Sequence, residues 1–363
     1  MAVFGLTGIR PAAAATITVT TTTDEYSDPG PGTGCSLREA IRAASSDVAF
    51  GGCPAGSGGD TIVLPAGTYL LAIGGANENL TAEGDLDIFN DPLTIQGAAA
   101  ATTVIDGSGM PGGDRVLHVM SEASLFDLTI TGGVNNDSFA SGGGVLNTGT
   151  ASFVRTIVSG NSSVGTTSSF GGGLYNSDGT LTVAESTIAD NTAGPTSGGS
   201  LGGGVYTTTA GVVTIVRSSI IGNTAAASGG GSSAQGGGVH NAGDMVTLEN
   251  TTVSGNVVSA ATTARGGGVS NEGDNTNVLL NTTVTGNTAT GGTPAGGGLR
   301  NQGTTTLTNT IVAGNTANGS PDCAGGATSG GHNIVGDDTG CAFTPGTGDK
   351  PDTDPLLGSL ADN

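Results

Sequence analysis

The chain has 363 residues, of which 69 are Gly, and its 30 acidic and 9 basic residues give it a net charge of −21. This composition excludes an ordinary helical or α/β domain, which would carry fewer Gly and more Leu, Glu and Lys. It also excludes a nucleic-acid-binding protein, because Lys350 is the single lysine and no basic patch is available for phosphates. We therefore expect an all-β repeat protein without a nucleic-acid partner.

The first 15 residues have the features of a signal-peptide remnant. They end in Ala13, Ala14 and Ala15, small residues of the kind found at signal-peptidase sites. The alternative is a disordered N-terminus. No later segment approaches the roughly 20 consecutive apolar residues of a transmembrane helix. We expect a secreted or cell-surface protein without a transmembrane segment.

Four cysteines form two local sets, Cys35 with Cys53 and Cys323 with Cys341, each separated by 18 residues. An even number of cysteines suits two disulfides in an exported protein, although spacing does not prove the pairing. Zinc is disfavoured because the sequence has no Cys-x-x-Cys motif with a nearby His.

Residues 16–60 are predicted to form an N-terminal cap. Ser36 followed by Glu39 makes a capping box, and the apolar stripe after it predicts a short helix near residues 36–46. Open ends of parallel sheets pair with other molecules unless they are covered. We interpret this helix as the lid over the first coil of a rod.

Six three-glycine blocks divide the centre of the chain into units of about 30 residues. The blocks lie at residues 142–144, 171–173, 202–204, 236–238, 266–268 and 296–298. Two columns of asparagine residues recur once per unit. The first contains Asn147, Asn176, Asn241, Asn271 and Asn301, with Thr207 in the missing position. The second contains Asn161, Asn191, Asn223, Asn256, Asn287 and Asn315.

A unit of this length with short β-branched runs fits one coil of a right-handed parallel β-helix, in which equivalent strands stack ~4.8 Å apart. Stacked Asn amides can then hydrogen-bond one another and the turns. We expect the β-helix to span residues 61–316, with regular repeats from about residue 140. Residues 317–363 would form a C-terminal coil and tail.

These motifs resemble those of known β-helix proteins. The hexapeptide CSLREA at 35–40, with DTIVLPAGTY at 60–69 and LTIQG at 93–97, resembles the N-terminal module of bacterial CSLREA-type right-handed β-helix proteins. The glycine blocks and Asn columns are similar to repeats of polymorphic outer-membrane proteins, with Ile or Val where those usually carry Phe. The resemblance implies a β-helix architecture and export, and suggests adhesion or surface display.

Two sets of residues are candidate binding sites. Tyr175, Tyr206 and His240, with Arg300, each stand two residues after a glycine block. If they face solvent, their stacked rings could bind sugars; the alternative is a ladder that only stiffens the sheet. Four acidic residues could offer oxygen ligands to Ca²⁺, and the alternative is a solvated acidic turn. They are Glu83, Asp85, Asp87 and Asp91.

Packing residues repeat, whereas no set of catalytic carboxylates converges, so no catalytic residue is assigned. We expect an exported scaffold for adhesion or surface display, with cell-surface glycans or other surface proteins as partners and its oligomeric state open. The alternative is a polysaccharide-active lyase or glycoside hydrolase of the pectin-lyase-like type. A third hypothesis is ice binding, suggested by the Thr-rich runs at 18–23 and 304–306, although no regular outward Thr-x-Thr column is evident.

Overall fold

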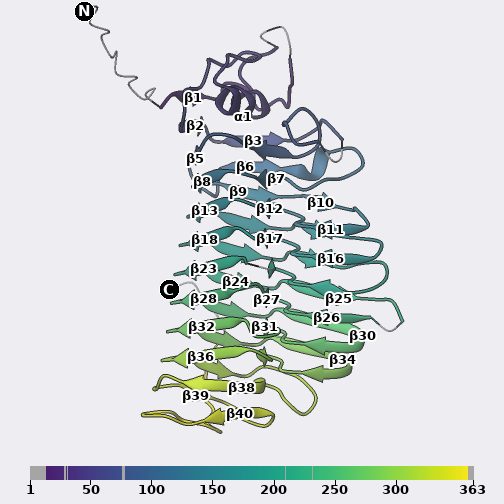
Figure 1. The fold of residues 1–363 in the computed structure, drawn as a ribbon, viewed down its shortest axis with the longest axis vertical. Coiled ribbons are helices and arrows are strands. Elements are labelled where there is room, and N and C mark those ends of the chain that lie inside the picture. The colour runs from purple at the N-terminus through teal and green to yellow at the C-terminus, as the bar shows by residue number, and fades with distance from the viewer. Residues whose placement is uncertain are drawn as a thin grey trace, which may run out of the picture.

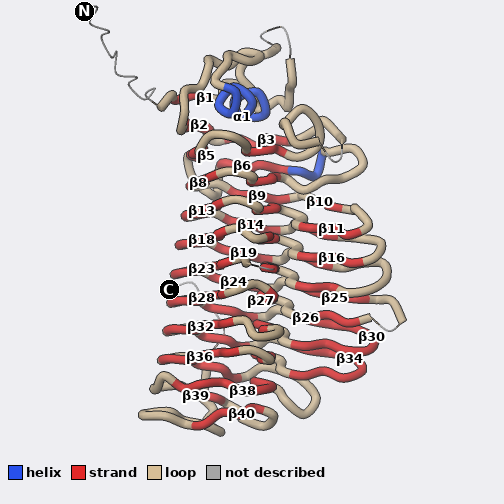
Figure 2. The backbone as a smooth tube through the Cα atoms, viewed as in Figure 1, coloured by secondary structure: helices blue, strands red, loops and turns tan. Residues whose placement is uncertain are grey.

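The computed structural model describes residues 14–27, 30, 32–75, 78–208, 210–230 and 232–358, so most of the expected signal-peptide remnant lies outside the described residues. The described chain is a parallel β-solenoid with one α-helix at its N-terminal end (Figures 1 and 2). The predicted all-β solenoid with a capping helix is confirmed.

Each regular coil passes through three sheet faces and one projecting arm. In one such coil the chain runs through β12 (Val145–Asn147), β13 (Thr150–Val154) and β14 (Ile157–Ser159), which we assign to faces 1, 2 and 3. It then leaves along β15 (Ser162–Ser163) and returns along β16 (Ser168–Phe170), which form the arm. Every strand pairs in parallel with its equivalent one coil later.

The other strands extend these four stacks. Face 1 also contains β4 (Leu86–Ile88), β7 (Leu117–Val119), β17 (Leu174–Ser177), β22 (Val205–Thr208), β27 (Val239–Ala242), β31 (Val269–Asn271), β35 (Leu299–Asn301) and the start of β38 (Cys323–Ser329). Face 2 contains β1 (Thr16–Thr18), β2 (Asp60–Leu64), β5 (Leu93–Gly97), β8 (Glu122–Phe126), β18 (Thr180–Ala184), β23 (Val212–Val216), β28 (Met245–Glu249), β32 (Thr276–Leu280), β36 (Thr304–Thr308), the end of β38, and β40 (Cys341–Thr344).

Face 3 contains β3 (Gly67–Leu70), β6 (Thr103–Asp106), β9 (Thr129–Thr131), β19 (Thr187–Ala189), β24 (Ser219–Ile221), β29 (Thr252–Ser254), β33 (Thr283–Thr285), β37 (Ile311–Ala313) and β39 (Ile334–Val335). The arm, at the right of Figure 1, contains β10 (Val134–Asn135), β11 (Phe139–Ser141), β20 (Thr192–Ala193), β21 (Ser200–Leu201), β25 (Thr224–Ala227), β26 (Ser233–Gln235), β30 (Val257–Arg265) and β34 (Thr288–Ala295). A 3₁₀ turn, Gly107–Gly109, follows β6.

Aliphatic columns fill the interior between the three faces. One inward column on face 2 and one on face 3 run through the regular coils with each residue at most 1% exposed: Phe153, Val183, Ile215, Leu248, Leu279 and Leu307, and Val158, Ile188, Ile220, Val253, Val284 and Val312. The arm has its own small core of Ala and Val side chains, which lets its outgoing and returning limbs approach closely. The solenoid is therefore packed throughout, with two cores side by side.

The second Asn column forms one continuous hydrogen-bonded ladder at the turn between face 3 and the arm. Each Nδ2 donates to the Oδ1 of the next Asn at 2.9–3.0 Å. The ladder ends where Asn315 Nδ2 donates to Asp322 Oδ1 at 2.8 Å. Because a carboxylate only accepts, Asp322 terminates the chain of amides without leaving a donor unsatisfied.

The first Asn column is interrupted. Asn147 donates to Asn176, and Asn271 donates to Asn301, in the expected order. Between them Asn176 donates to the hydroxyl of Thr207. Asn241 donates to Asn277 of face 2. Sequence register therefore placed these residues correctly in a column, but only some of them bond to their neighbour in it.

The first glycine of each block requires the absence of a side chain. Gly171 has φ +58°, and a Cβ there would lie 2.4 Å from the carbonyl oxygen of Leu174. Its neighbour Gly172 faces the carbonyl of Gly203 one coil later, where a Cβ would lie 2.5 Å away. The blocks are thus tight corners where the chain turns from the arm into face 1.

Helix α1 (Leu37–Ser46) covers the N-terminal end of the rod. Ser36 is its N-cap, and the capping box with Glu39 is present as predicted. Its apolar stripe is buried, and the helix contacts β1, β2 and β4. Both predicted disulfides, Cys35–Cys53 and Cys323–Cys341, are formed.

Face 2 carries a hydroxyl column that the sequence had not revealed. Its central outward position is Thr or Ser at Thr16, Thr61, Thr94, Ser124, Ser152, Thr182, Thr214, Thr247, Thr306 and Thr328, with Val278 as the exception. It is a single column: no Thr-x-Thr pattern persists through the six regular coils, because the first outward position is Val212 in β23 and Met245 in β28. Strand register, rather than the visible Thr runs, decides which hydroxyls stack.

Candidate functional site

The predicted aromatic set and Asp87 of the predicted acidic set share one outward column of face 1. Strand pairing stacks this column in the order Asp87, His118, Leu146, Tyr175, Tyr206, His240, Ser270, Arg300 and Ala324. These side chains alternate along each strand with the buried aliphatic residues, so they project away from the interior. The column lies on the side where the arm returns.

The predicted aromatic residues stack on one another. The ring centroids of Tyr175 and Tyr206 are 5.2 Å apart, and those of Tyr206 and His240 are 5.5 Å apart, with nearly parallel planes. Phe170, from the returning limb of the arm, stacks on both tyrosines at 6.2 and 5.3 Å. Such stacking stabilises the rings beyond the effect of their burial.

The arm covers most of this stripe. Tyr206 is 7% exposed and His240 is fully buried, whereas Tyr175 and Arg300 are half-buried. Ser270 separates Arg300 from His240, so the arginine does not complete the stack. His240 Nε2 lies 3.2 Å from Glu272 Oε2. The condition for sugar stacking, exposure to solvent, is not met at Tyr206 and His240, and this burial favours the alternative of a stiffening ladder.

The buried position of Tyr206 predicts its titration. Burial raises the pKa of the Tyr206 phenol to about 12. We expect the difference in tyrosinate absorbance between the chain and its Tyr206→Phe variant to develop near that pH, with circular dichroism checking that the fold persists. A difference that develops near the ordinary value of about 10 would mean that the arm does not cover the ring.

The predicted acidic set separates into two pairs. Asp87 lies on β4 and Asp85 directly precedes it, and both are buried. Glu83 is exposed and Asp91 is partly exposed. Among the described residues, Asp85, Asp87 and His118 place one ligand atom each within 4.8 Å of one another. The structure thus brings two of the four predicted residues together and adds His118, which the sequence analysis had missed.

Charged groups surround this cluster. Arg115 Nη1 donates to Asp85 Oδ2 at 3.2 Å, and its Nη2 lies 3.9 Å from Asp137. Burial raises the pKa of Asp85 well above its usual value; the charge of Arg115 opposes this rise, and repulsion from Asp87 and Asp114 adds to it. Burial likewise raises the pKa of Asp114. Such a set of closely spaced carboxyl groups is a candidate site for a cation or for proton transfer.

Arg38 connects this cluster to the cap. Its guanidinium is fully buried, pairs with Asp24 at 2.7 Å, and donates to the carbonyls of Thr81, Gly84 and Asp85. The loop before β4 is therefore held against helix α1. Arg38 belongs to the hexapeptide motif that the sequence shows, but its contacts with the loop before β4 are visible only in the fold.

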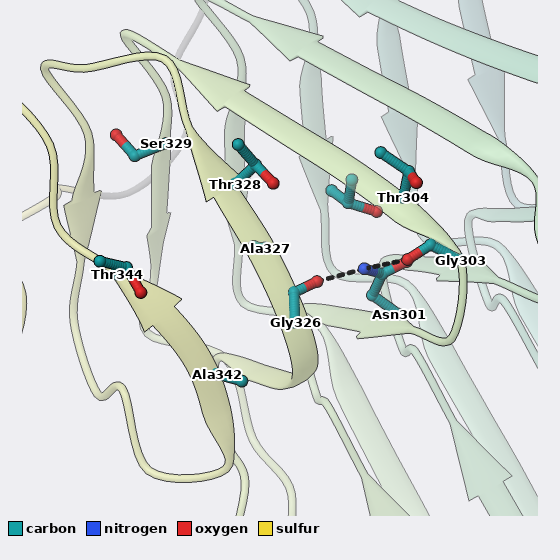
Figure 3. A pocket seen from close by; sticks show the side chains of 10 residues that line it. Asn301, Gly303, Thr304, Gly326, Ala327, Thr328, Ser329, Ala342 and Thr344 are labelled. Atoms are coloured by element: carbon teal, nitrogen blue, oxygen red, sulfur yellow. Dashed lines mark hydrogen bonds between the residues drawn. The ribbon is translucent and has the colours of Figure 1, made fainter.

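An open hollow of about 510 Å³ lies at the C-terminal end (Figure 3). It is lined by hydroxyl, amide and backbone groups from β35, β36, β38 and β40, among them Thr304, Thr328 and Thr344. Asn301 Nδ2 donates to the carbonyl of Gly326 across it. With no titratable side chain in its lining, this hollow offers hydrogen bonds rather than acid or base chemistry.

Comparisons with solved structures find distant likeness of fold. ORF18 of Geobacillus virus E2 is 12% identical, with a TM-score of 0.42, over 81% of this chain and 52% of that one. The Agl-KA catalytic domain is 14% identical, with a TM-score of 0.33, over 86% and 64%. The mannuronan C-5 epimerase AlgE4 A-module of Azotobacter vinelandii is 15% identical, with a TM-score of 0.34, over 90% and 95%. This chain therefore spans about half of the first of these proteins and less than two thirds of the second.

No protein-family model and no curated protein matches the sequence. The resemblance to CSLREA-type proteins thus rests on the quoted motifs alone. Within the described residues, no helix has the length and apolarity needed to cross a membrane.

Proposed function

We propose that this chain is an extracellular β-helix scaffold that adheres through face 2 to flat, uncharged polysaccharide. The two disulfides are consistent with an extracellular location. The proposal keeps the adhesive role suggested by the CSLREA-type resemblance, but it moves the glycan contact from the buried aromatic ladder to an open sheet.

The observation that carries the proposal is the near absence of charge on face 2. In the regular coils, from β13 to β36, the three outward columns contain Thr, Ser, Val, Ala, Met and Leu, and Glu249 is the one charged residue. The whole chain nevertheless has a net charge of −21. The central column places a hydroxyl about every 4.8 Å between coils, except at Val278, beside flanking columns that are almost free of charge. Such a surface suits a flat neutral polymer, because neither partner must give up charge hydration.

A double substitution tests this surface. Thr182→Glu with Thr214→Glu places two carboxylates in the central outward column. Each carboxylate loses hydration under a docked polymer, so we expect at least about a tenfold loss of affinity for insoluble cellulose or chitin in a sedimentation assay. The matched control, Thr167→Glu with Thr196→Glu, adds the same charge at exposed positions on the arm and should bind as the unmodified chain does. Equal binding by both variants would exclude face 2 as the adhesive surface.

Ice binding is a second candidate, and the hydroxyl column of face 2, interrupted at Val278 alone among the positions named above, is the observation that favours it. A rigid two-dimensional repeat of hydroxyl and methyl groups can order water over its whole area. Measurement of thermal hysteresis and of ice recrystallisation separates this function from adhesion, using the same two variants. Ice-growth inhibition without polysaccharide binding would select it.

The enzyme alternative depends on the cluster around Asp85, Asp87 and His118. Carboxyl groups with raised pKa values occur at sites of acid and base catalysis, although Asp87 here is fully buried. Incubation with uronic-acid polysaccharides, followed by the absorbance of unsaturated ends, tests a lyase. Product formation that disappears in the Asp87→Asn variant would support it.

A further inference from the structure

The cluster at Asp85, Asp87 and His118 contains two buried polar atoms that face each other and make no hydrogen bond. Asp87 is fully buried and His118 is 9% exposed. Asp87 Oδ1 and His118 Nδ1 are 3.4 Å apart, and neither atom has a hydrogen-bond partner. Buried polar atoms almost always have a hydrogen-bond partner, so two without one at the same place need an explanation.

The hydroxyl of Thr148 lies beside the ring nitrogen of His118 that faces away from Asp87. Thr148 Oγ1 lies 3.2 Å from the carbonyl oxygen of Val119 and 3.4 Å from His118 Nε2. In the neutral tautomer with its hydrogen on Nε2, the hydroxyl accepts from Nε2 and the ring presents the lone pair of Nδ1 to Asp87. In metal sites a histidine is oriented in this way, by a hydrogen bond from the nitrogen that does not bind.

We propose that Asp85, Asp87 and His118 bind one divalent transition-metal ion of the Zn²⁺ type. Two ligands about 2.1 Å from a tetrahedral ion stand roughly 3.4 Å apart, which is the separation of Asp87 Oδ1 and His118 Nδ1. The third ligand atom, from Asp85, lies within 4.8 Å of both. The ion would give both unpartnered atoms a bond and would offset the repulsion between the two carboxylates.

Neighbouring groups fix the ligands in place. Asp87 Oδ2 accepts from the backbone N–H of Thr81 at 2.9 Å, which leaves Oδ1 free to bind. The Thr81 hydroxyl also donates to the backbone carbonyl of Asp87 and accepts from its backbone N–H. Arg38 holds the carbonyls of Thr81 and Asp85 from the cap. The ligands thus come from neighbouring coils, on β4 and β7 and just before β4, and the cap stabilises their geometry.

The donor set selects the class of ion. Calcium binds oxygen ligands, usually six to eight of them, whereas imidazole nitrogen with carboxylate oxygen suits zinc and its first-row neighbours. The Ca²⁺ site expected from Glu83, Asp85, Asp87 and Asp91 is therefore replaced, in this proposal, by a smaller site that contains His118.

Metal titration of the full chain, purified without a histidine tag, tests the site. All four cysteines are in disulfides, so no free thiolate competes for the ion. We expect one Zn²⁺ per chain by calorimetry, and visible absorption bands when Co²⁺ is used instead. His118→Ala should weaken binding by more than about 100-fold, and Thr148→Val, which removes only the orienting hydroxyl, by about tenfold.

Controls separate loss of the site from loss of the fold. Asp87→Asn keeps an oxygen that can accept from the Thr81 N–H but removes the charge, so it should abolish binding while circular dichroism stays unchanged. His332→Ala removes an exposed histidine from the far end of the rod and should bind Zn²⁺ as the unmodified chain does. The proposal is overturned if the unmodified chain binds no Zn²⁺ or binds Ca²⁺ alone. It is equally overturned if His118→Ala and Asp87→Asn bind as tightly as the control.

Discussion

Replacing Arg38 by alanine is expected to destabilise the N-terminal cap by about 3–5 kcal/mol, the usual cost of removing one partner of a buried ion pair. The substitution leaves Asp24 with a buried charge, since its side chain is 2% exposed and its Oδ1 pairs with the guanidinium. It also leaves the carbonyls of Thr81, Gly84 and Asp85 without the donor that holds them. Helix α1 and the loop before β4 should then separate from the rod.

The effect should be local, because each coil of a solenoid contacts only its neighbours. Hydrogen exchange should therefore accelerate in α1, β1 and β4 while protection of β28 and β32 stays unchanged. Arg42→Ala is the matched control, since Arg42 lies on the same helix and makes a cation–π contact with Phe89 at 5.7 Å. Such a contact is worth at most about 1–2 kcal/mol. Equal effects of the two substitutions would show that Arg38 does not clamp the cap.

The regular coils could be predicted from the sequence because their columns repeat in several positions at once. Glycine corners, aliphatic positions and Asn positions recur in the same order through six units, and only stacking of one coil on the next satisfies all three. Phe153 and Val158 are buried as that register requires. Residues that recur with the period of the sequence are therefore stacked on one another in the structure.

The arm could not be predicted in the same way. The segments between the second Asn column and the glycine blocks differ in length and contain mainly Ser, Thr, Ala and Gly. Such segments carry little hydrophobic pattern to show that the chain turns back on itself. The returning limb brings Phe170 onto Tyr206, which is why the aromatic stripe is covered and the exposure that sugar binding required is not met at Tyr206.

The cluster at Asp87 and His118 was missed for a related reason. These residues belong to β4 and β7, in coils that precede the glycine blocks and have no marker of register. The acidic residues looked like one local turn, because residues 83–91 are close in sequence. In the solenoid the relevant neighbour of Asp87 is the residue one coil later, which is His118.

Replacing Asn223 by alanine, in the middle of the second ladder, should cost about 3–5 kcal/mol in free energy of unfolding. Its Oδ1 accepts from the backbone N–H and the Nδ2 of Asn191 at 3.0 and 2.9 Å, so both donors lose their partner. The carbonyl of Ile188 loses its bond from Asn223 Nδ2 as well. All these groups are buried, and each unsatisfied one costs about 1–3 kcal/mol.

Urea-induced unfolding followed by circular dichroism measures this loss, with Asn250→Gly, from the next coil, as the control. Asn250 is exposed and has φ +49°, a conformation that glycine adopts without strain, so the control should stay within about 1 kcal/mol of the unmodified chain. A loss below about 1 kcal/mol in Asn223→Ala would mean that water replaces the amide. The ladder would then follow from the stacking of coils, whereas the larger loss would show that its hydrogen bonds hold each coil to the next.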